Sequence, residues 1–479
     1  MDSVDLCYTP ATDLVMLLQD GELSSLELTE AIVGRIDALN PLLNAFCLVR
    51  AEEALEASRA ADAARARCDD LGLLHGIPFS LKDMTLTRGV RTTFGSNALA
   101  TNVPDANAAF VDRLVGAGGI FLGKTTTCEF GNKALCDGPL LGTTNNPWKL
   151  THVSGGSSGG AAAAVAAGLG PIAEGSDAAG SIRVPASCCG VVGLKPSFGR
   201  VPYAPGFSPF ESLLHVGPIA RTVPDCALML QVMAGPDPRD VFSIEDRSFD
   251  FPAAVREPSA RGLHIAYSRN LGFNPLESEV LEHTDNAARV FASVLGAFVE
   301  EVDPDLPDPR EREILYWRVW LGTLAEDFIL PNVGSPDEVD AHLRELHELG
   351  RGISAFDFYR TSVLYRGELY WRMHDFFERY DLLLTPTLAV RPFEQLGGPA
   401  GPAMINGEPI EPFAGWHLTY PFNLTGHPAI SVPCGYSADG LPIGLQIAGR
   451  RHADAAVLCA AAAFEQAMPE LPKRPPLDP

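Results

Sequence analysis

Short apolar runs bounded by glycine alternate with alanine-rich stretches between residues 74 and 194, and this alternation limits the possible folds more than any other feature. Residues 77–81 and 119–123 are typical of buried strands, whereas 161–167 is a strong helix former that ends at Gly168. Strands that alternate with helices in this way predict a largely parallel sheet covered by helices. The pattern therefore predicts an α/β fold.

The flanking regions extend this prediction. Apolar residues recur at helical spacing over 26–39, and Asn40-Pro41 is predicted to end that helix. Residues from about 303 to 380 are charged and aromatic and predict a helical excursion that borders the sheet and the active site. Strand-like segments then return at 381–384, 429–432 and 443–447. Because the sheet regains strands at its end, we expect one domain over 1–479.

Charge and cysteine usage exclude several classes of function. The 479-residue chain carries 36 basic and 60 acidic residues, a net charge of −24 that repels phosphate backbones and anionic lipids. We therefore expect neither a nucleic-acid nor a membrane partner. The ten cysteines show no CxxC pairs and no dense disulfide spacing, which indicates reduced thiols in the cytoplasm. The acidic start also differs from a signal peptide.

Two motifs suggest chemistry that their surroundings do not favour. Residues 118–125 match a phosphate loop, but 120–122 is itself a buried-strand signature, whereas a phosphate loop needs exposed backbone N–H groups. Residues 155–159 match the G-x-S-x-G elbow of a Ser-acid-His triad, and histidines follow downstream. Its lead-in, 145–153, is predicted to be a loop instead of the apolar strand that precedes such an elbow. We therefore favour neither nucleotide binding nor that triad.

A third arrangement uses serines and a lysine. The glycine-rich loop 155–160 opens onto a helix that advances about 15 Å over ten residues, and the strand-like segment 171–175 returns about 16 Å. Ser157 and Ser181 can therefore lie side by side. The small residues before Ser181 suit a turn whose N–H groups point into a cleft and hold an oxyanion. The alternative is that both loops are tight turns packed for space.

Lys82 discriminates between these two interpretations. It ends the apolar strand 77–81, where a lysine is either a surface residue or a functional buried amine. To act as a base, its pKa must fall from about 10.4 to roughly 7 or 8, a difference of about 4 kcal/mol that full desolvation can supply. Asp83 then faces the opposite side of the strand.

Taken together, these residues resemble the amidase signature hydrolases. The resemblance rests on the loop 155–160, Ser181 within 180–183, Lys82 within 80–83, and Gly193-Leu194-Lys195-Pro196. It extends over nearly the whole chain, through 217–223 and 423–429. The resemblance implies the family's large mixed sheet sandwiched between α-helices, in a single domain.

The resemblance also implies a catalytic apparatus. Ser181 would be the nucleophile, and Ser157, held in a cis peptide, would relay a proton between Ser181 and the neutral amine of Lys82. The oxyanion would be held by the backbone N–H groups of Ala178, Ala179, Gly180 and Ser181. Ser158, Asp177 and Arg183 would support these loops. No metal or organic cofactor is implied.

The substrate class is predicted from weaker signals. The sequence Asp-Ala-Ala-Gly-Ser at 177–181 departs from the two glycines common before the nucleophile and resembles 6-aminohexanoate cyclic-dimer hydrolases and related amidases, such as aryl acylamidases. An apolar acyl or aryl pocket is predicted from Cys128, Phe130, Trp416, His417, Tyr420 and Phe422, with core packing as the alternative.

The predicted function is hydrolysis of small apolar amides, anilides or carbamates, the last being a urethanase activity. The alternative is the glutamine-hydrolysing amidotransferase component of a tRNA-dependent transamidase complex, which shares the triad. Residues 303–391 do not resemble the glutamine-binding half of that component. A small-molecule substrate and a homodimer are the expected partners.

Overall fold

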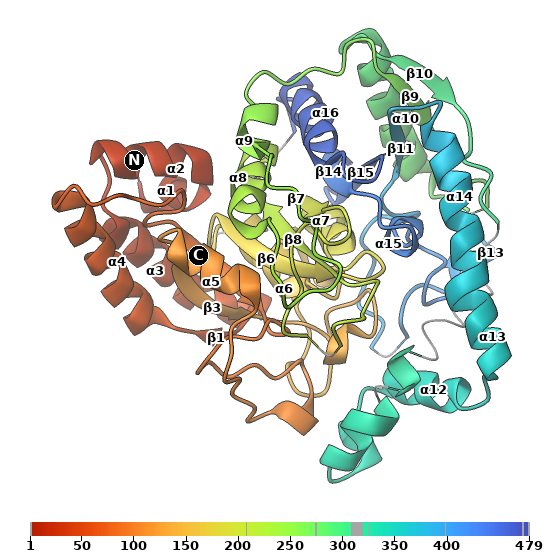
Figure 1. Cartoon of the computed structure of the whole chain (residues 1–479), viewed down its shortest axis with the longest axis horizontal. Helices are drawn as coiled ribbons and strands as arrows, with labels where there is room; N and C mark the ends of the chain where they lie inside the picture. Colours follow the sequence, from red (N-terminus) through yellow and green to blue (C-terminus); the bar gives the residue numbers. More distant parts are fainter. Residues whose placement is uncertain are drawn as a thin grey trace.

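The alternating pattern folds into one large sheet in the computed structural model, which describes residues 2–206, 208–273, 275–307, 320–323, 325–397, 399–471 and 474–477. Within these residues the sheet has 11 strands, in the order β1-β3-β2-β6-β8-β7-β14-β15-β11-β9-β10 (Figure 1). The strands are β1 (Phe46–Val49), β2 (Pro78–Lys82), β3 (Ile120–Thr125), β6 (Ile172–Asp177), β7 (Val192–Lys195), β8 (His215–Ala220), β9 (His264–Tyr267), β10 (Phe298–Glu301), β11 (Leu382–Pro386), β14 (Ala429–Tyr436) and β15 (Pro442–Gly449).

Helices flank this sheet, as the predicted α/β fold requires. They are α1 (Ser3–Tyr8), α2 (Ala11–Asp20), α3 (Ser25–Leu43), α4 (Ala51–Ala66), α5 (Ala109–Gly116), α6 (Gly159–Ala166), α7 (Arg183–Cys189), α8 (Val223–Met233), α9 (Phe251–Ala254), α10 (Ser278–Ser293), α12 (Ala341–Gly350), α13 (Ala355–Tyr359), α14 (Arg366–Phe377), α15 (Pro421–Leu424) and α16 (Asp454–Ala467). Helices α1–α4 lie at one end of the molecule, and α12–α14 lie along the opposite side (Figure 1). None of the described helices is both long and apolar enough to span a bilayer.

The sheet is mixed, as the family resemblance implied, and not largely parallel throughout. Strands β3, β2 and β6 are mutually parallel, which confirms the prediction for the region that carries the motifs. From β6 to β15 each neighbouring pair is antiparallel. A tight turn at 437–441 joins β14 to β15, and so short a connection can link only antiparallel strands.

Two local predictions were wrong. Helix α3 continues through Pro41 and ends at Asn44, whose left-handed backbone (φ 49°) and N–H bond to Asn40 O (2.7 Å) terminate it. The lead-in to the glycine-rich loop is a short antiparallel hairpin of β4 (Asn145–Asn146) and β5 (Lys149–Val153), outside the main sheet. Asn146 Nδ2 stabilises this hairpin by donating to Val153 O (2.9 Å).

The helical excursion from about 303 to 380 is present as α12, α13 and α14 with a π-helical stretch, η6 (Arg360–Tyr365), between the last two. Residues 308–319 and 324 of it lie outside the described residues. Leu321, Leu343 and Leu346 of the excursion share one apolar cluster with Phe94 and Phe130, which follow β2 and β3. The excursion therefore packs against the segments that follow β3 and β2, the strand that ends in Lys82.

Candidate active site

Lys82 is the last residue of β2 and is fully buried. Because β2 and β6 are parallel, their carboxyl ends meet at one edge of the sheet, which brings Lys82 beside the end of β6. Its Nζ donates to Ser157 Oγ (2.6 Å) and to Ser176 Oγ (3.0 Å). Desolvation lowers the pKa of Lys82 to about 8, against the opposing effect of the nearby Glu174 carboxyl group. The amine therefore loses its proton near pH 8 instead of near pH 10.5, so that a fraction of it is neutral at physiological pH.

The glycine-rich loop that contains Ser157 is held closely against its neighbours. The Gly156–Ser157 peptide bond is cis. A Cβ atom on Gly156 would lie 2.2 Å from Leu135 O, so that only glycine fits there. The Ser158 N–H donates to Ser181 O (3.1 Å), which places the loop directly beside the turn that follows β6.

The turn that ends in Ser181 differs from the predicted oxyanion site at one position. The Gly180 N–H donates to Asp177 Oδ1 (2.7 Å), so it is directed at this carboxylate and is not available to an oxyanion. The short acidic side chain at the end of β6 accepts this N–H because Asp177 lies only three residues before Gly180, within reach of a local side-chain-to-backbone hydrogen bond. The N–H groups of Ala178, Ala179 and Ser181 have no hydrogen-bond acceptor among the described residues.

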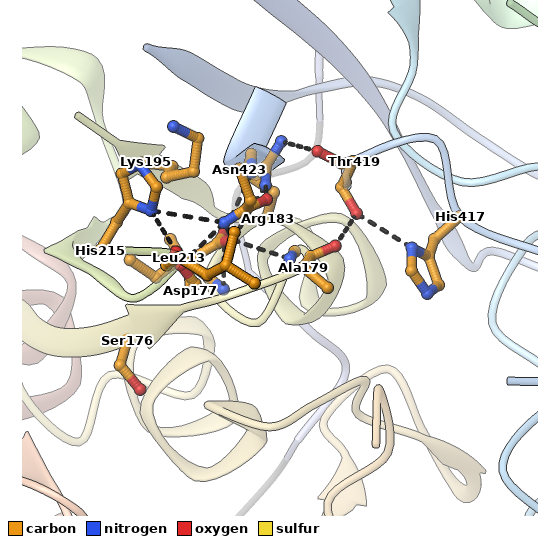
Figure 2. Close-up of polar contacts among 12 residues, drawn as sticks. Ser176, Asp177, Ala179, Arg183, Lys195, Leu213, His215, His417, Thr419 and Asn423 are labelled. Carbon is orange, nitrogen blue, oxygen red and sulfur yellow. Dashed lines mark hydrogen bonds and ion pairs between the residues drawn. The ribbon is translucent and has the colours of Figure 1, made fainter. Parts of the chain in front are cut away.

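A buried ion pair between Arg183 and Asp177 holds the turn that ends in Ser181. Arg183 donates from Nε to Asp177 Oδ2 and from Nη2 to Asp177 Oδ1, both at 2.9 Å. Its Nη1 donates to Thr419 O and to Gln446 Oε1, both at 2.7 Å. Asn423 Nδ2 adds a bond to Asp177 O (2.8 Å), as Figure 2 shows. Burial raises the pKa of Asp177, but Arg183 outweighs it and holds the pKa below its ordinary value.

Thr419 holds the other side of the turn. Its hydroxyl donates to Ala179 O (2.5 Å), and His417 Nδ1 lies 3.0 Å from the same hydroxyl (Figure 2). Burial lowers the pKa of His417 to about 4, which keeps its ring neutral. Gly180 has a φ of 135°, and a Cβ atom there would lie 2.1 Å from Thr419 Oγ1. The turn therefore requires glycine at this position.

A cavity opens beside Ser181. It is lined by Gly131, Asn132, Lys133, Ala134, Ala178, Ala179, Gly180, Ser181, Val184, Leu321, Phe413, Ala414 and His417. Of the six residues predicted to line a substrate pocket, only His417 belongs to this set. Cys128, Phe130, Trp416, Tyr420 and Phe422 are each at most 1% exposed and belong to the packed interior. Phe130, for example, stacks on Phe94 with ring centroids 5.6 Å apart.

The excursion supplies part of the wall of this cavity. Leu321 lines it directly. Lys133 donates to Asp340 Oδ2 (2.9 Å) and forms an ion pair with Asp137 (2.7 Å). Asp340 is the N-cap of α12, so this pairing ties the start of that helix to the cavity.

Several residues of the site were not found from the sequence. Ser176, which contacts Lys82, could have been inferred from its place directly after the strand-like segment 171–175, at the start of the turn that leads to Ser181. No local sequence signal identifies the other three residues, because their segments show no periodicity or motif. They are Thr419, Asn132 and Lys133. Among the described residues, no group of three or more His, Cys, Asp or Glu is placed to hold a metal ion.

Comparison with known proteins assigns the family. The chain matches the Amidase family over residues 27–458. It is 41% identical to an acylamidase of Rhodococcus erythropolis over 483 residues, which cover 99% of this chain and 98% of the relative. It is also 40% identical to a glutamyl-tRNA(Gln) amidotransferase subunit of Moorella thermoacetica over 501 residues, 99% of each chain.

Comparison with solved structures assigns the same family. A bacterial aryl acylamidase of the amidase signature family superposes with a TM-score of 0.90 at 34% identity, over 96% of both chains. A 6-aminohexanoate cyclic dimer hydrolase in complex with substrate superposes with a TM-score of 0.86 at 31% identity, over 98% of this chain and 99% of that one. This chain therefore belongs to the amidase signature family. It is a hydrolase of amide C–N bonds, and the predicted resemblance is confirmed.

Proposed function

We propose that the protein is an amidohydrolase of small apolar amides, anilides or carbamates that uses Ser181, Ser157 and Lys82. The observation that carries this proposal is the buried Lys82 amine, hydrogen bonded to Ser157 beside the Ser181 turn. A buried amine whose pKa lies near the working pH is a competent base. The apolar cavity wall, with Val184 and Leu321, favours an apolar substrate.

The reaction proceeds through an acyl-enzyme. Ser181 Oγ attacks the substrate carbonyl, and its proton passes by way of Ser157 to the Lys82 amine. The N–H groups of Ala178, Ala179 and Ser181 stabilise the tetrahedral oxyanion. When the C–N bond breaks, the proton returns by the same route to the leaving nitrogen, and a free amine departs. Water then attacks the acyl-enzyme, with the same relay taking its proton, and releases the acid and Ser181.

The assignments around this chemistry are part of the proposal. Ser158, Asp177 and Arg183 are supporting residues that shape the two loops, and they do not touch the substrate. Residues 1–479 form one catalytic domain, in which the excursion borders the active site. The protein works with reduced thiols in the cytoplasm, which agrees with its ten unpaired cysteines. The partner is a small-molecule substrate, and a homodimer is the assembly to test by light scattering.

The experiment that tests the function is amine release, followed by mass spectrometry, from acyl anilides, aryl carbamates, primary carboxamides and glutamine in competition. Wild type is compared with Ser181→Ala and Ser157→Ala. We expect anilide or carbamate turnover in wild type and a loss of at least about 10³-fold in Ser181→Ala. Unchanged turnover in Ser181→Ala would contradict the proposal.

The second candidate is the transamidase component, which the relationship to the glutamyl-tRNA(Gln) amidotransferase of Moorella thermoacetica favours. This role predicts a stable complex with other chains and glutamine hydrolysis only within it. The glutamine reaction is therefore repeated after addition of cell lysate, together with a pull-down on the tagged chain. Glutaminase activity that appears only with lysate would support this candidate and count against a stand-alone amidohydrolase.

A further inference from the structure

Asn132 is buried beside the reactive serine without a hydrogen-bond partner. Its side chain is 1% exposed, and within the described part of the chain neither Oδ1 nor Nδ2 forms a hydrogen bond. Leaving a polar group buried and unsatisfied costs about 1–3 kcal/mol, so native proteins seldom do so without a reason. Asn132 lines the same cavity as Ser181. The missing partner can therefore be a group of the substrate.

The backbone around Asn132 is rigidly placed. The preceding turn is η2 (Glu129–Gly131), where Glu129 accepts from Ser96 Oγ (2.5 Å) and from the Asp340 N–H (2.6 Å). A Cβ atom on Gly131 would lie 3.0 Å from Ser157 Oγ, so the residue before Asn132 borders the bridging serine. The amide is consequently held near the reacting atoms before any substrate arrives.

The other polar side chains of the cavity are already engaged. Lys133 is paired with Asp340 and Asp137, and an ammonium group can only donate. His417 contacts Thr419 Oγ1 and Phe413 O, at 3.0 and 3.3 Å. Ser181 is the proposed nucleophile. Among the described residues that line the cavity, Asn132 Oδ1 is thus the side-chain acceptor that remains for a substrate N–H.

The scissile group of an amide offers two polar atoms to the site. Its carbonyl oxygen is assigned to the N–H groups of Ala178, Ala179 and Ser181, which leaves the N–H on the leaving nitrogen. We infer that Asn132 Oδ1 accepts a hydrogen bond from this N–H and thereby selects N–H-bearing amides, anilides and carbamates over esters and N-alkylated amides. This inference rests on the proposed function and makes Asn132 a specificity-determining residue.

The test compares three substrates that differ only at the scissile atom: 4-nitroacetanilide, N-methyl-4-nitroacetanilide and 4-nitrophenyl acetate. The kcat/KM of wild type is compared with that of Asn132→Leu, which has the same branched shape and no acceptor, and of Asn132→Asp, which retains an acceptor oxygen. We expect Asn132→Leu to lower kcat/KM for the anilide about 10- to 100-fold. The ester and the N-methyl anilide change less than about threefold, and Asn132→Asp restores most of the anilide activity.

A merely structural role would lower all three reactions together, and this outcome would overturn the inference. An unchanged ratio of anilide to ester turnover in Asn132→Leu would overturn it as well. If wild type cleaves the ester in a Ser181-dependent way but not the anilide, the selection for N–H is refuted while the serine chemistry stands. If wild type cleaves none of the substrates in a Ser181-dependent way, the proposed function fails first and the inference with it.

Discussion

At the scale of single residues, the protein contains two buried lysines of similar pKa but different surroundings. Desolvation lowers the pKa of both Lys82 and Lys124 to about 8. Lys82 contacts Ser157, whereas Lys124 donates to Thr87 Oγ1 (2.8 Å), away from the serine loop. Proximity to Ser157, and not the pKa value alone, therefore distinguishes the proposed base.

The pH dependence of turnover tests this distinction. As the pH rises through about 8, Lys82 loses its proton and becomes able to accept one, so we expect kcat/KM for 4-nitroacetanilide to increase with pH and to level off above that value. Lys82→Arg, which stays charged, should be inactive at every pH. Lys124→Met is the control and should retain the rise of kcat/KM with pH. If the rise with pH disappeared in Lys124→Met but persisted in Lys82→Arg, the assignment of Lys82 as the base would be contradicted.

At the scale of elements, the turn after β6 depends on glycine because a second segment closes over it. Thr419 approaches Gly180 so closely that a methyl group there has no space, and the positive φ of Gly180 disfavours any other residue. The same threonine holds the Ala179 carbonyl, so its position affects the direction of the neighbouring N–H groups. The orientation of the proposed oxyanion donors thus depends both on the turn after β6 and on the segment that contains Thr419.

Gly180→Ala tests this joint dependence. We expect it to lower kcat for the anilide by at least about 100-fold, because displaced donors no longer stabilise the transition state. The matched control is Gly34→Ala in α3, where a Cβ atom meets nothing within 4 Å, and activity should be unchanged. Steady-state kinetics and thermal unfolding are measured on both variants. Wild-type kcat in Gly180→Ala would show that the turn tolerates a side chain.

At the scale of the whole molecule, Arg183 joins parts of the chain that are far apart in sequence. Its guanidinium group contacts Asp177 at the end of β6, Gln446 in β15 and the segment that begins at Thr419. All of these groups are buried, with Arg183 itself 0% exposed. Removing the Arg183 side chain would leave the buried Asp177 carboxylate without its charge partner. One side chain therefore links β6, β15 and the segment that begins at Thr419.

Arg183→Met should lower the free energy of unfolding by about 3–5 kcal/mol, the usual cost of breaking a buried pair. Because Arg183 holds the pKa of Asp177 below its ordinary value, this stabilisation is present above about pH 4 and is lost as the pH falls. Denaturant titration of Arg183→Met is compared with Arg50→Met, which removes an exposed pair with Glu53 and should cost about 0–1 kcal/mol. Equal losses in the two variants would contradict the prediction.

How much the sequence predicts depends on whether the interaction is local. The burial of Lys82 and the meeting of the Ser157 and Ser181 loops follow from a strand, a helix and their lengths. The hydrogen bond from the Gly180 N–H to Asp177 is also local. The same N–H could instead have bound the oxyanion, and the sequence pattern does not distinguish these two acceptors. The placement of Trp416 in the core instead of the cavity depends on distant packing, which periodicity does not encode.

Part of the cavity wall comes from stretches of chain that carry none of the proposed catalytic residues. The proposed catalytic residues lie between residues 82 and 181, whereas Leu321, Phe413 and Ala414 come from the excursion and from a later loop. This part of the wall can therefore vary in evolution while the reacting groups are kept. A library randomised at Leu321, Phe413 and Ala414, or a chimera that exchanges the excursion with that of a relative, explores new substrates while leaving the chemical step intact.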